Sequence, residues 1–227
     1  MEIQPTVYYI AAITGILILL VFVVNRALTK FDPLSEPKGL VLLVLMGVQM
    51  VENMVSSKTN ESITRRLSPY IATVALYIFL SNISGLFSFD PPTSNYSVTL
   101  TLALITCVLI EKYAIEFNGV KNYIHGLFEP MAPFVIINII SKISTFASLS
   151  LRLFGNIISG SILMTIIYAM CASVSKLIPL VGQFNFLGVI IAPVLHFYFD
   201  LFSGAMQTYL FITLSIAFIS KELPKRS

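Results

Sequence analysis

The sequence is poor in charged residues, histidine and cysteine, and each shortage excludes a class of protein. Charged residues make up 11% of the 227 residues, whereas soluble domains carry about 25%. Hydrophobic residues make up 56% and the mean hydropathy is +0.88, which indicates an integral membrane protein. The net charge is +3 and no basic patch stands out, so we expect the lipid bilayer, and not nucleic acid, as a partner.

The scarcity of histidine and cysteine limits the chemistry that the chain can perform. A metal or haem site needs clustered ligands, but His125 and His196 fall on opposite sides of the membrane in the topology given below. Cys107 and Cys171 lie in apolar segments and do not indicate a redox compartment. The sequence has no phosphate-binding loop and no nucleophile elbow. We therefore expect no cofactor, no metal ion and no catalytic activity of the chain alone.

Five apolar runs are long enough to cross about 30 Å of hydrocarbon. The sequence predicts a single all-α membrane domain with an N-terminal span at 7–28, an interfacial helix at 39–57, a helical hairpin at 69–117 and a long tilted hairpin at 131–220. The first run lacks a basic region ahead of it and a small-residue cleavage site, which indicates a retained helix. Segment 39–57 is expected in the interface because basic residues flank it and its polar residues share one face.

The basic residues predict how the chain is oriented in the membrane. They follow the first span, from Arg26 to Lys38, whereas only Glu2 is charged ahead of it. By the positive-inside rule the N-terminus then lies outside. The loop at 90–95 has no basic residue and is expected outside as well. The basic segment at 221–226 places the C-terminus in the cytoplasm.

The last two apolar runs, 133–172 and 186–220, are longer than a membrane span requires. A helix of about 40 residues is about 60 Å long, twice the hydrocarbon thickness, so it must be tilted, bent or broken. Polar residues recur along the first of these runs at steps of three or four and share one face. That face must contact protein or water, because lipid cannot satisfy it. The polar stripe consists of Asn138, Ser141, Lys142, Thr145, Ser148, Arg152, Asn156 and Ser159.

Arg152 lies in the middle of this apolar run. A charged side chain at the bilayer centre costs roughly 2.5–3.5 kcal/mol on insertion scales, and a guanidinium cannot lose its proton to avoid that cost. It therefore needs a partner or water, and we expect a functional role. The alternative is a structural arginine that pairs with a neighbouring helix or reaches the interface.

A second polar face occurs on the last run, where His196, Asp200 and Gln207 are spaced to share one side of a helix. Asp200 is the only acidic residue between Glu129 and Glu222. An isolated carboxylate inside a bilayer is a candidate for an ion path. The alternative is a residue near a helix end that faces water.

Three motifs resemble those of one family. Residues 150–156 (Ser-Leu-Arg-Leu-Phe-Gly-Asn) resemble the signature of subunit a of F-type ATP synthases, the stator half of the membrane motor. Residues 82–86 resemble the Asn-x-x-Gly-Leu of its third helix, and Gln207 with Phe211 resembles the Gln-x-x-x-Phe of its last helix. Five spans, an interfacial second helix and a tilted terminal hairpin are also the layout of that family.

The resemblance implies that Arg152 faces the carboxylate of a rotating ring of c subunits and separates two aqueous half-channels. It implies that Asn156 and Gln207 are polar neighbours of the arginine and that Asp200 belongs to the outer half-channel. His196 is a candidate for the same path. At the position nine residues after the arginine the family usually has Glu or His, but this chain has Ser161. Asp200 is then expected to be the main titratable group of the outer half-channel.

The resemblance also implies the partners, the location and the transported species. The partners are the ring of c subunits, the peripheral-stalk b subunits and the remaining ATP synthase subunits, and the Phe-Gly-Asn form of the signature suggests a bacterial plasma membrane. The transported species is expected to be the proton, with Na⁺ as the alternative, because the carboxylate site of the ring chiefly decides between the two ions. A fixed cation beside a narrow path would repel an arriving proton and favour the ionised form of a passing carboxylate. The rival hypotheses are a secondary ion transporter and another intramembrane ion channel, but a transporter commonly shows an inverted repeat, and the arginine signature occurs once.

Overall fold

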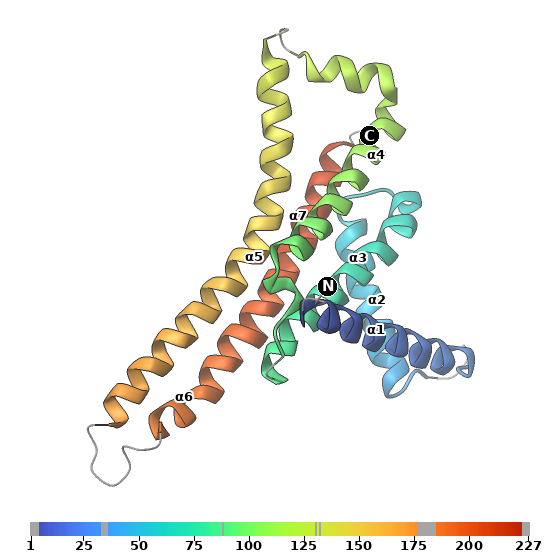
Figure 1. Ribbon diagram of the computed structural model, residues 1–227. Coiled ribbons are helices and arrows are strands. Elements are labelled where there is room, and N and C mark those ends of the chain that lie inside the picture. Colours follow the sequence, from blue (N-terminus) through green and yellow to red (C-terminus); the bar gives the residue numbers. More distant parts are fainter. Residues whose placement is uncertain are drawn as a thin grey trace.

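The computed structural model describes residues 5–32, 36–87, 89–129, 131, 133–176 and 185–223. These residues form helices and short connections, and no strand occurs among them. The structure has 5 helices long and apolar enough to cross a membrane, and a shorter apolar helix at Leu40–Ser56. The predicted all-α membrane fold is therefore confirmed (Figure 1). The predicted terminal charges at Glu2, Lys225 and Arg226 lie outside the described residues.

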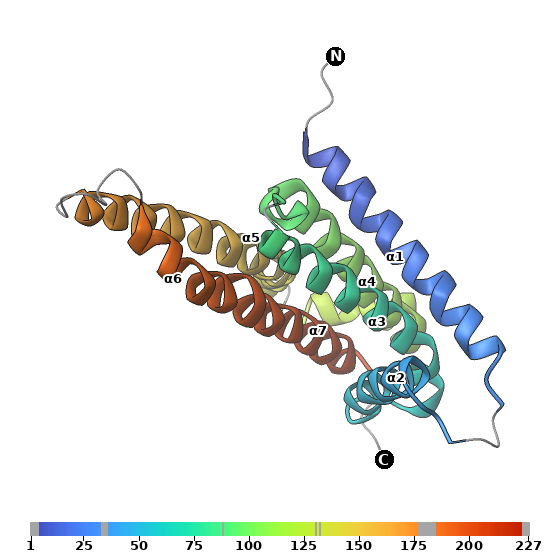
Figure 2. The same cartoon turned by 90° about the horizontal axis from the view of Figure 1, so that it is seen from below.

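The first two helices form the edge of the molecule. In α1 (Pro5–Thr29) most apolar side chains are exposed and Ile13 is buried, as expected for a helix that is bathed by lipid. Helix α2 (Leu40–Ser56) packs on α3 near one end of the bundle (Figure 2). Its placement in the membrane interface stays a prediction.

A central hairpin of α3 (Glu61–Ile83) and α4 (Tyr96–Leu127) supplies half of the buried hydrophobic side chains among the described residues. Two short 3-10 turns, η1 (Ser84–Phe87) and η2 (Pro92–Ser94), lie in the connection. Two apolar clusters pack the hairpin against the last helix and against α5. The first contains Leu67, Ile71, Ile110 and Ile216, and the second contains Val74, Ile78, Leu149, Leu153 and Phe211.

Helix α4 is longer than the sequence predicted and changes direction inside. The kink lies at Gly119, where φ is 74° and ψ is 150°. Glycine is suited to this backbone because a side chain would be strained at positive φ. Beyond the kink, the second leg of α4 runs across the molecule to the start of α5 (Figure 1). We call residues 96–118 the first leg of α4 and residues 120–127 the second leg.

The two overlong runs form an antiparallel pair of helices, side by side in both views (Figures 1 and 2). Helix α5 (Phe134–Ser175) has 42 residues, and its first third runs in a different direction from the remainder (Figure 1). The second run is continuous over Phe186–Lys221. Residues 177–184, between the two runs, lie outside the described residues.

The second run contains a π-helix that the sequence did not predict. It consists of α6 (Phe186–His196), the π-helix η3 (Phe197–Ser203) and α7 (Gly204–Lys221). A π-turn widens the helix and shifts the side chains that follow, and such turns are frequent at functional sites. Asp200 lies within η3.

Candidate functional site

Two polar cavities lie at different heights along the α5–α7 pair. The η3 cavity, of about 260 Å³, is lined by the α3–α4 connection, by α5 from Asn156 to Met164 and by the second run from His196 to Gly204. The α4 cavity, of about 490 Å³, is lined by both legs of α4, by α5 from Asn138 to Thr145 and by the end of α7. Arg152 lies between the two cavities along α5.

The η3 cavity brings together four of the predicted site residues, which are Asn156, Ser161, His196 and Asp200. A hydrogen bond of 2.6 Å joins His196 Nδ1 to Asp200 Oδ2. The Asp200 side chain is 11% exposed and that of His196 is 35% exposed. The Asp200 side chain is therefore largely covered by protein, and its place in an ion path stays a prediction. Asn156 Oδ1 accepts a hydrogen bond of 2.9 Å from Ser203 Oγ, which ties α5 to η3.

Small residues let the helices around Asp200 approach closely. A Cβ on Gly85 would lie 3.0 Å from the Asp200 carboxyl carbon, and a Cβ on Gly204 would lie 2.8 Å from Asn82 Cβ. Asn82 donates a 3.2 Å hydrogen bond to the Gly204 carbonyl and accepts a 3.0 Å bond from Thr93 Oγ1. Asn82 thus joins α3, η2 and α7 beside the η3 cavity.

Arg152 is exposed on α5, although its neighbours Leu149 and Leu153 are only 2% and 1% exposed. Its guanidinium lies 3.5 Å from Ser148 Oγ. Among the described residues, no carboxylate forms an ion pair with it. A Cβ on Gly155, three residues on, would meet nothing within 4 Å. The described part of the chain therefore supplies no counter-charge to the guanidinium and leaves space beside it.

Gln207 contacts the backbone at Arg152 rather than its side chain. Its Nε2 donates a 2.5 Å hydrogen bond to the Arg152 carbonyl oxygen, and the residue is only 7% exposed. The contact fixes α7 against α5 at the height of the arginine. Asp200 lies within the π-helix and Gln207 follows it in α7, so the sequence spacing alone did not give their relative orientation.

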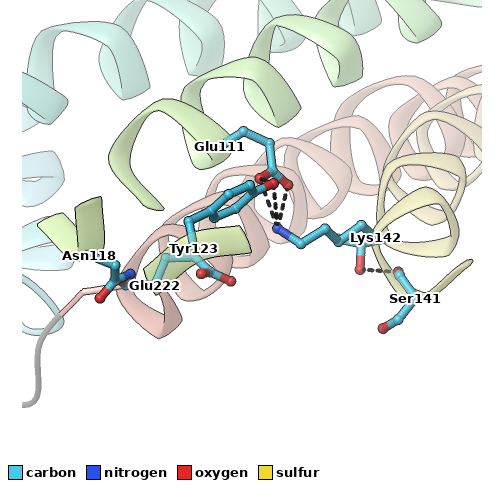
Figure 3. Close-up of polar contacts among 7 residues, drawn as sticks. Glu111, Asn118, Tyr123, Ser141, Lys142 and Glu222 are labelled. Atoms are coloured by element: carbon cyan, nitrogen blue, oxygen red, sulfur yellow. Dashed lines mark hydrogen bonds and ion pairs between the residues drawn. The ribbon is translucent and has the colours of Figure 1, made fainter. Parts of the chain in front are cut away.

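The α4 cavity contains a charged cluster that sequence reasoning missed. Lys142 Nζ donates to both Glu111 carboxylate oxygens, at 2.9 and 2.8 Å, and to Tyr123 Oη at 3.2 Å. The Tyr123 hydroxyl donates to Glu111. Figure 3 shows the three side chains converging from the two legs of α4 and from α5. A lysine inside an apolar run needs a counter-charge, and this was the signal that could have pointed to Glu111.

The residues of the predicted polar stripe on α5 are divided between the two cavities and the exposed surface. Its N-terminal members line the α4 cavity, Arg152 is exposed and Asn156 lines the η3 cavity. The members that line the α4 cavity are Asn138, Ser141, Lys142 and Thr145. Within the described part of the chain, no three His, Cys, Asp or Glu side chains are grouped in a way that could hold a metal ion.

Comparison with known proteins gives one consistent family. Residues 7–220 match the model of the family described as ATP synthase A chain. The chain is 29% identical over 209 residues to ATP synthase subunit a of Desulforamulus reducens, covering 92% of this chain and 76% of that protein. It is 28% identical over 223 residues to the subunit a of Bacillus pumilus, covering 93% and 88%. It is 32% identical over 170 residues to the sodium ion specific subunit a of Propionigenium modestum, covering 68% and 53%.

Proposed function

The chain belongs to the ATP synthase A chain family, and we propose that it is the proton-conducting stator subunit of a rotary F-type ATP synthase. In this proposal the η3 cavity is the outer half-channel, the α4 cavity is the inner half-channel and Arg152 separates them. A ring of c subunits carries protons between the two on its carboxylates, and peripheral-stalk b subunits hold this chain still. The ATP chemistry takes place on other subunits.

The observation that carries the proposal is the order of the two cavities along two antiparallel helices. On α5, Thr145 lines the α4 cavity and Asn156 lines the η3 cavity, with about 16 Å of helix between them. On the second run, Gly204 lines the η3 cavity and Phe218 lines the α4 cavity. On each helix, the stretch between the two cavities contains one partner of the hydrogen bond between Gln207 and the Arg152 carbonyl oxygen. An ion that enters one cavity therefore needs a carrier to reach the other.

The surroundings of Arg152 favour a carrier with a negative charge. The long helices expose many apolar side chains, and near the arginine Leu151 is 53% exposed and Ile158 is 37% exposed. Lipid can cover such side chains but cannot satisfy a guanidinium. A neighbouring helix with a carboxylate satisfies the charge, and the open space at Gly155 lets that helix approach.

The cavity linings support the proposed sidedness and the proposed ion. The η3 cavity is lined by the α3–α4 connection, which has no basic residue in its 90–95 loop, as expected for the outer face. The α4 cavity is lined by Lys221, next to the basic C-terminal segment. A hydrogen-bonded carboxylate and imidazole, as in the Asp200–His196 pair, are groups that exchange protons.

The test is replacement of Arg152 in the assembled complex. Arg152→Ala removes no ion pair among the described residues, so we expect normal assembly, whereas breaking a buried ion pair costs roughly 3–5 kcal/mol. ATP-driven acidification of membrane vesicles should be abolished, and a passive proton leak should appear because the like-charge barrier is gone. Arg152→Lys should also lose coupling, because a desolvated lysine can deprotonate.

The matched control is Arg65→Ala, which changes an exposed arginine that pairs with Glu61 outside both cavities. An exposed ion pair contributes roughly 0–1 kcal/mol, so this variant should pump normally. Near-normal pumping by Arg152→Ala, normalised to assembled complex, would refute the proposed function of the arginine.

A further inference from the structure

The charged cluster in the α4 cavity, formed by Glu111, Tyr123 and Lys142, joins three separate segments. Glu111 lies on the first leg of α4, Tyr123 on its second leg beyond the Gly119 kink, and Lys142 on α5. The Lys142 ammonium also lies 4.5 Å from the centre of the Tyr123 ring. One cluster thus holds the corner where the two legs of α4 meet α5 (Figure 3).

The corner has little apolar packing to hold it. Within α5, no residue before Leu149 is buried, so the first third of the helix depends largely on polar contacts. Asn138 Nδ2 donates to the carbonyls of Leu127 and Glu129, at 2.8 and 3.1 Å. Together with the charged cluster, these bonds set the width of the α4 cavity.

Both charged groups of the cluster also face the cavity. The side chain of Lys142 is 32% exposed and that of Glu111 is 27% exposed, so water and ions reach them. Among the described residues, the other charged side chains that line the cavity belong to Glu129, Lys221 and Glu222. Glu129 pairs with His125 at 3.4 Å, and its side chain is 69% exposed, so its charge is better screened than that of Glu111.

Either charge alone would hinder a cation in this cavity. An uncovered Glu111 carboxylate would attract and hold a cation, and an uncovered Lys142 ammonium would repel it, with an energy that rises as water is excluded. In the cluster, the carboxylate accepts hydrogen bonds from the ammonium and from the tyrosine hydroxyl. The wall of the cavity is therefore polar and, at this point, electrically neutral.

We propose that Glu111 and Lys142, positioned by Tyr123, form a charge-compensated site in the inner ion path, where each charged group cancels the effect of the other on the passing cation. This inference rests on the proposed function. It adds three positioning residues that act on the rate of ion passage through the α4 cavity, at least ten positions before Arg152 along the chain.

The experiment compares Glu111→Gln, Lys142→Met and the double variant in the complete complex. Passive proton flux is measured in inverted vesicles after removal of the ATPase head, so that the α4 cavity opens to the medium, and is normalised to assembled complex. Each single variant should lower the flux roughly tenfold at low ionic strength, the effect of about 1.4 kcal/mol of uncompensated charge. The double variant, which has neither charge, should recover most of the flux.

The salt response gives each single variant its own signature. Added salt screens the uncovered ammonium of Glu111→Gln, so sodium chloride and choline chloride should both raise its flux. Lys142→Met exposes a carboxylate that a small cation can occupy, so sodium chloride should inhibit it and choline chloride should not. Tyr123→Phe keeps the ring and both charges, which still compensate each other, so it should retain flux within about twofold. It loses two hydrogen bonds, one to Glu111 and one from Lys142, each of roughly 0.5–1.5 kcal/mol.

The control Glu61→Gln makes the same chemical change in an exposed ion pair outside the cavity and should behave as the parent. Unchanged flux in either single variant would overturn the inference. Equal losses in both single variants and the double variant, or a common failure to assemble, would also overturn it, because the cluster would then only hold the corner. Arg152→Ala in the same vesicles tests the proposed function separately.

Discussion

Asp200→Asn separates the structural role of Asp200 from its role as a proton carrier. The amide keeps the size of the side chain and its contact with His196 Nδ1, which is 2.6 Å in the structure. A hydrogen bond to a charged group contributes roughly 1.5–3 kcal/mol and a neutral one roughly 0.5–1.5 kcal/mol. The expected loss of stability is thus about 1 kcal/mol, too little to prevent assembly.

The effect of Asp200→Asn on ion flow should be much larger, because an amide cannot take up and release a proton. Removal of a positioned proton-transfer group typically costs about 10²–10⁴ in rate in enzymes. We expect ATP-driven acidification of vesicles to fall at least about tenfold at unchanged levels of assembled complex. Asp32→Asn is the matched control, since Asp32 lies between α1 and α2 and lines neither cavity.

Two further variants test whether the carboxylate or the exact side chain matters. Asp200→Glu keeps a carboxylate, so it should retain much of the rate, with some loss because the longer side chain must fit against Gly85, which lies close to Asp200. Ser161 lines the same cavity, so Ser161→Glu in the Asp200→Asn background should restore part of the flow. Unchanged pumping by Asp200→Asn itself would refute the reasoning.

Two other predictions concern topology and packing. A cysteine placed at Asn95 should react with an impermeant thiol reagent from outside and one placed at Lys58 from inside; inside labelling at Asn95 would contradict the proposed sidedness. Gly204→Ala should lower stability by roughly 1–3 kcal/mol, because its Cβ would lie 2.8 Å from Asn82 Cβ. Gly47→Ala in α2 is the matched control in thermal unfolding of the complex, since its Cβ meets nothing within 4 Å, and equal effects of the two changes would refute the packing argument.

The family-like motifs were visible in the sequence, but the contacts that they make were not. Gln207 was expected as a polar neighbour of Arg152, and it contacts the carbonyl oxygen rather than the guanidinium. Asn82 belonged to a recognised motif, and the structure shows that it joins α3, η2 and α7. A motif gives the identity of a side chain, whereas its partner depends on how distant helices pack.

The η3 π-helix illustrates a second limit of sequence reasoning. The spacing from His196 to Gln207 was interpreted with the period of an α-helix. The π-turns of Phe197–Ser203 change the rotation per residue, and the local composition did not indicate them. His196, the last residue of α6, nevertheless contacts Asp200 in the middle of η3.

The sequence by itself determined the membrane class, the helical spans and the polar faces of the long helices, because these follow from local composition and from the helical period. Only the tertiary structure decided that Lys142 pairs with Glu111, 31 positions away, since that contact depends on the direction the chain takes after the kink at Gly119. The separation of the two cavities on either side of Arg152 was decided in the same way. It arises where the bend in α5, the π-helix and the close approach of α3 to α7 bring residues from distant parts of the chain together.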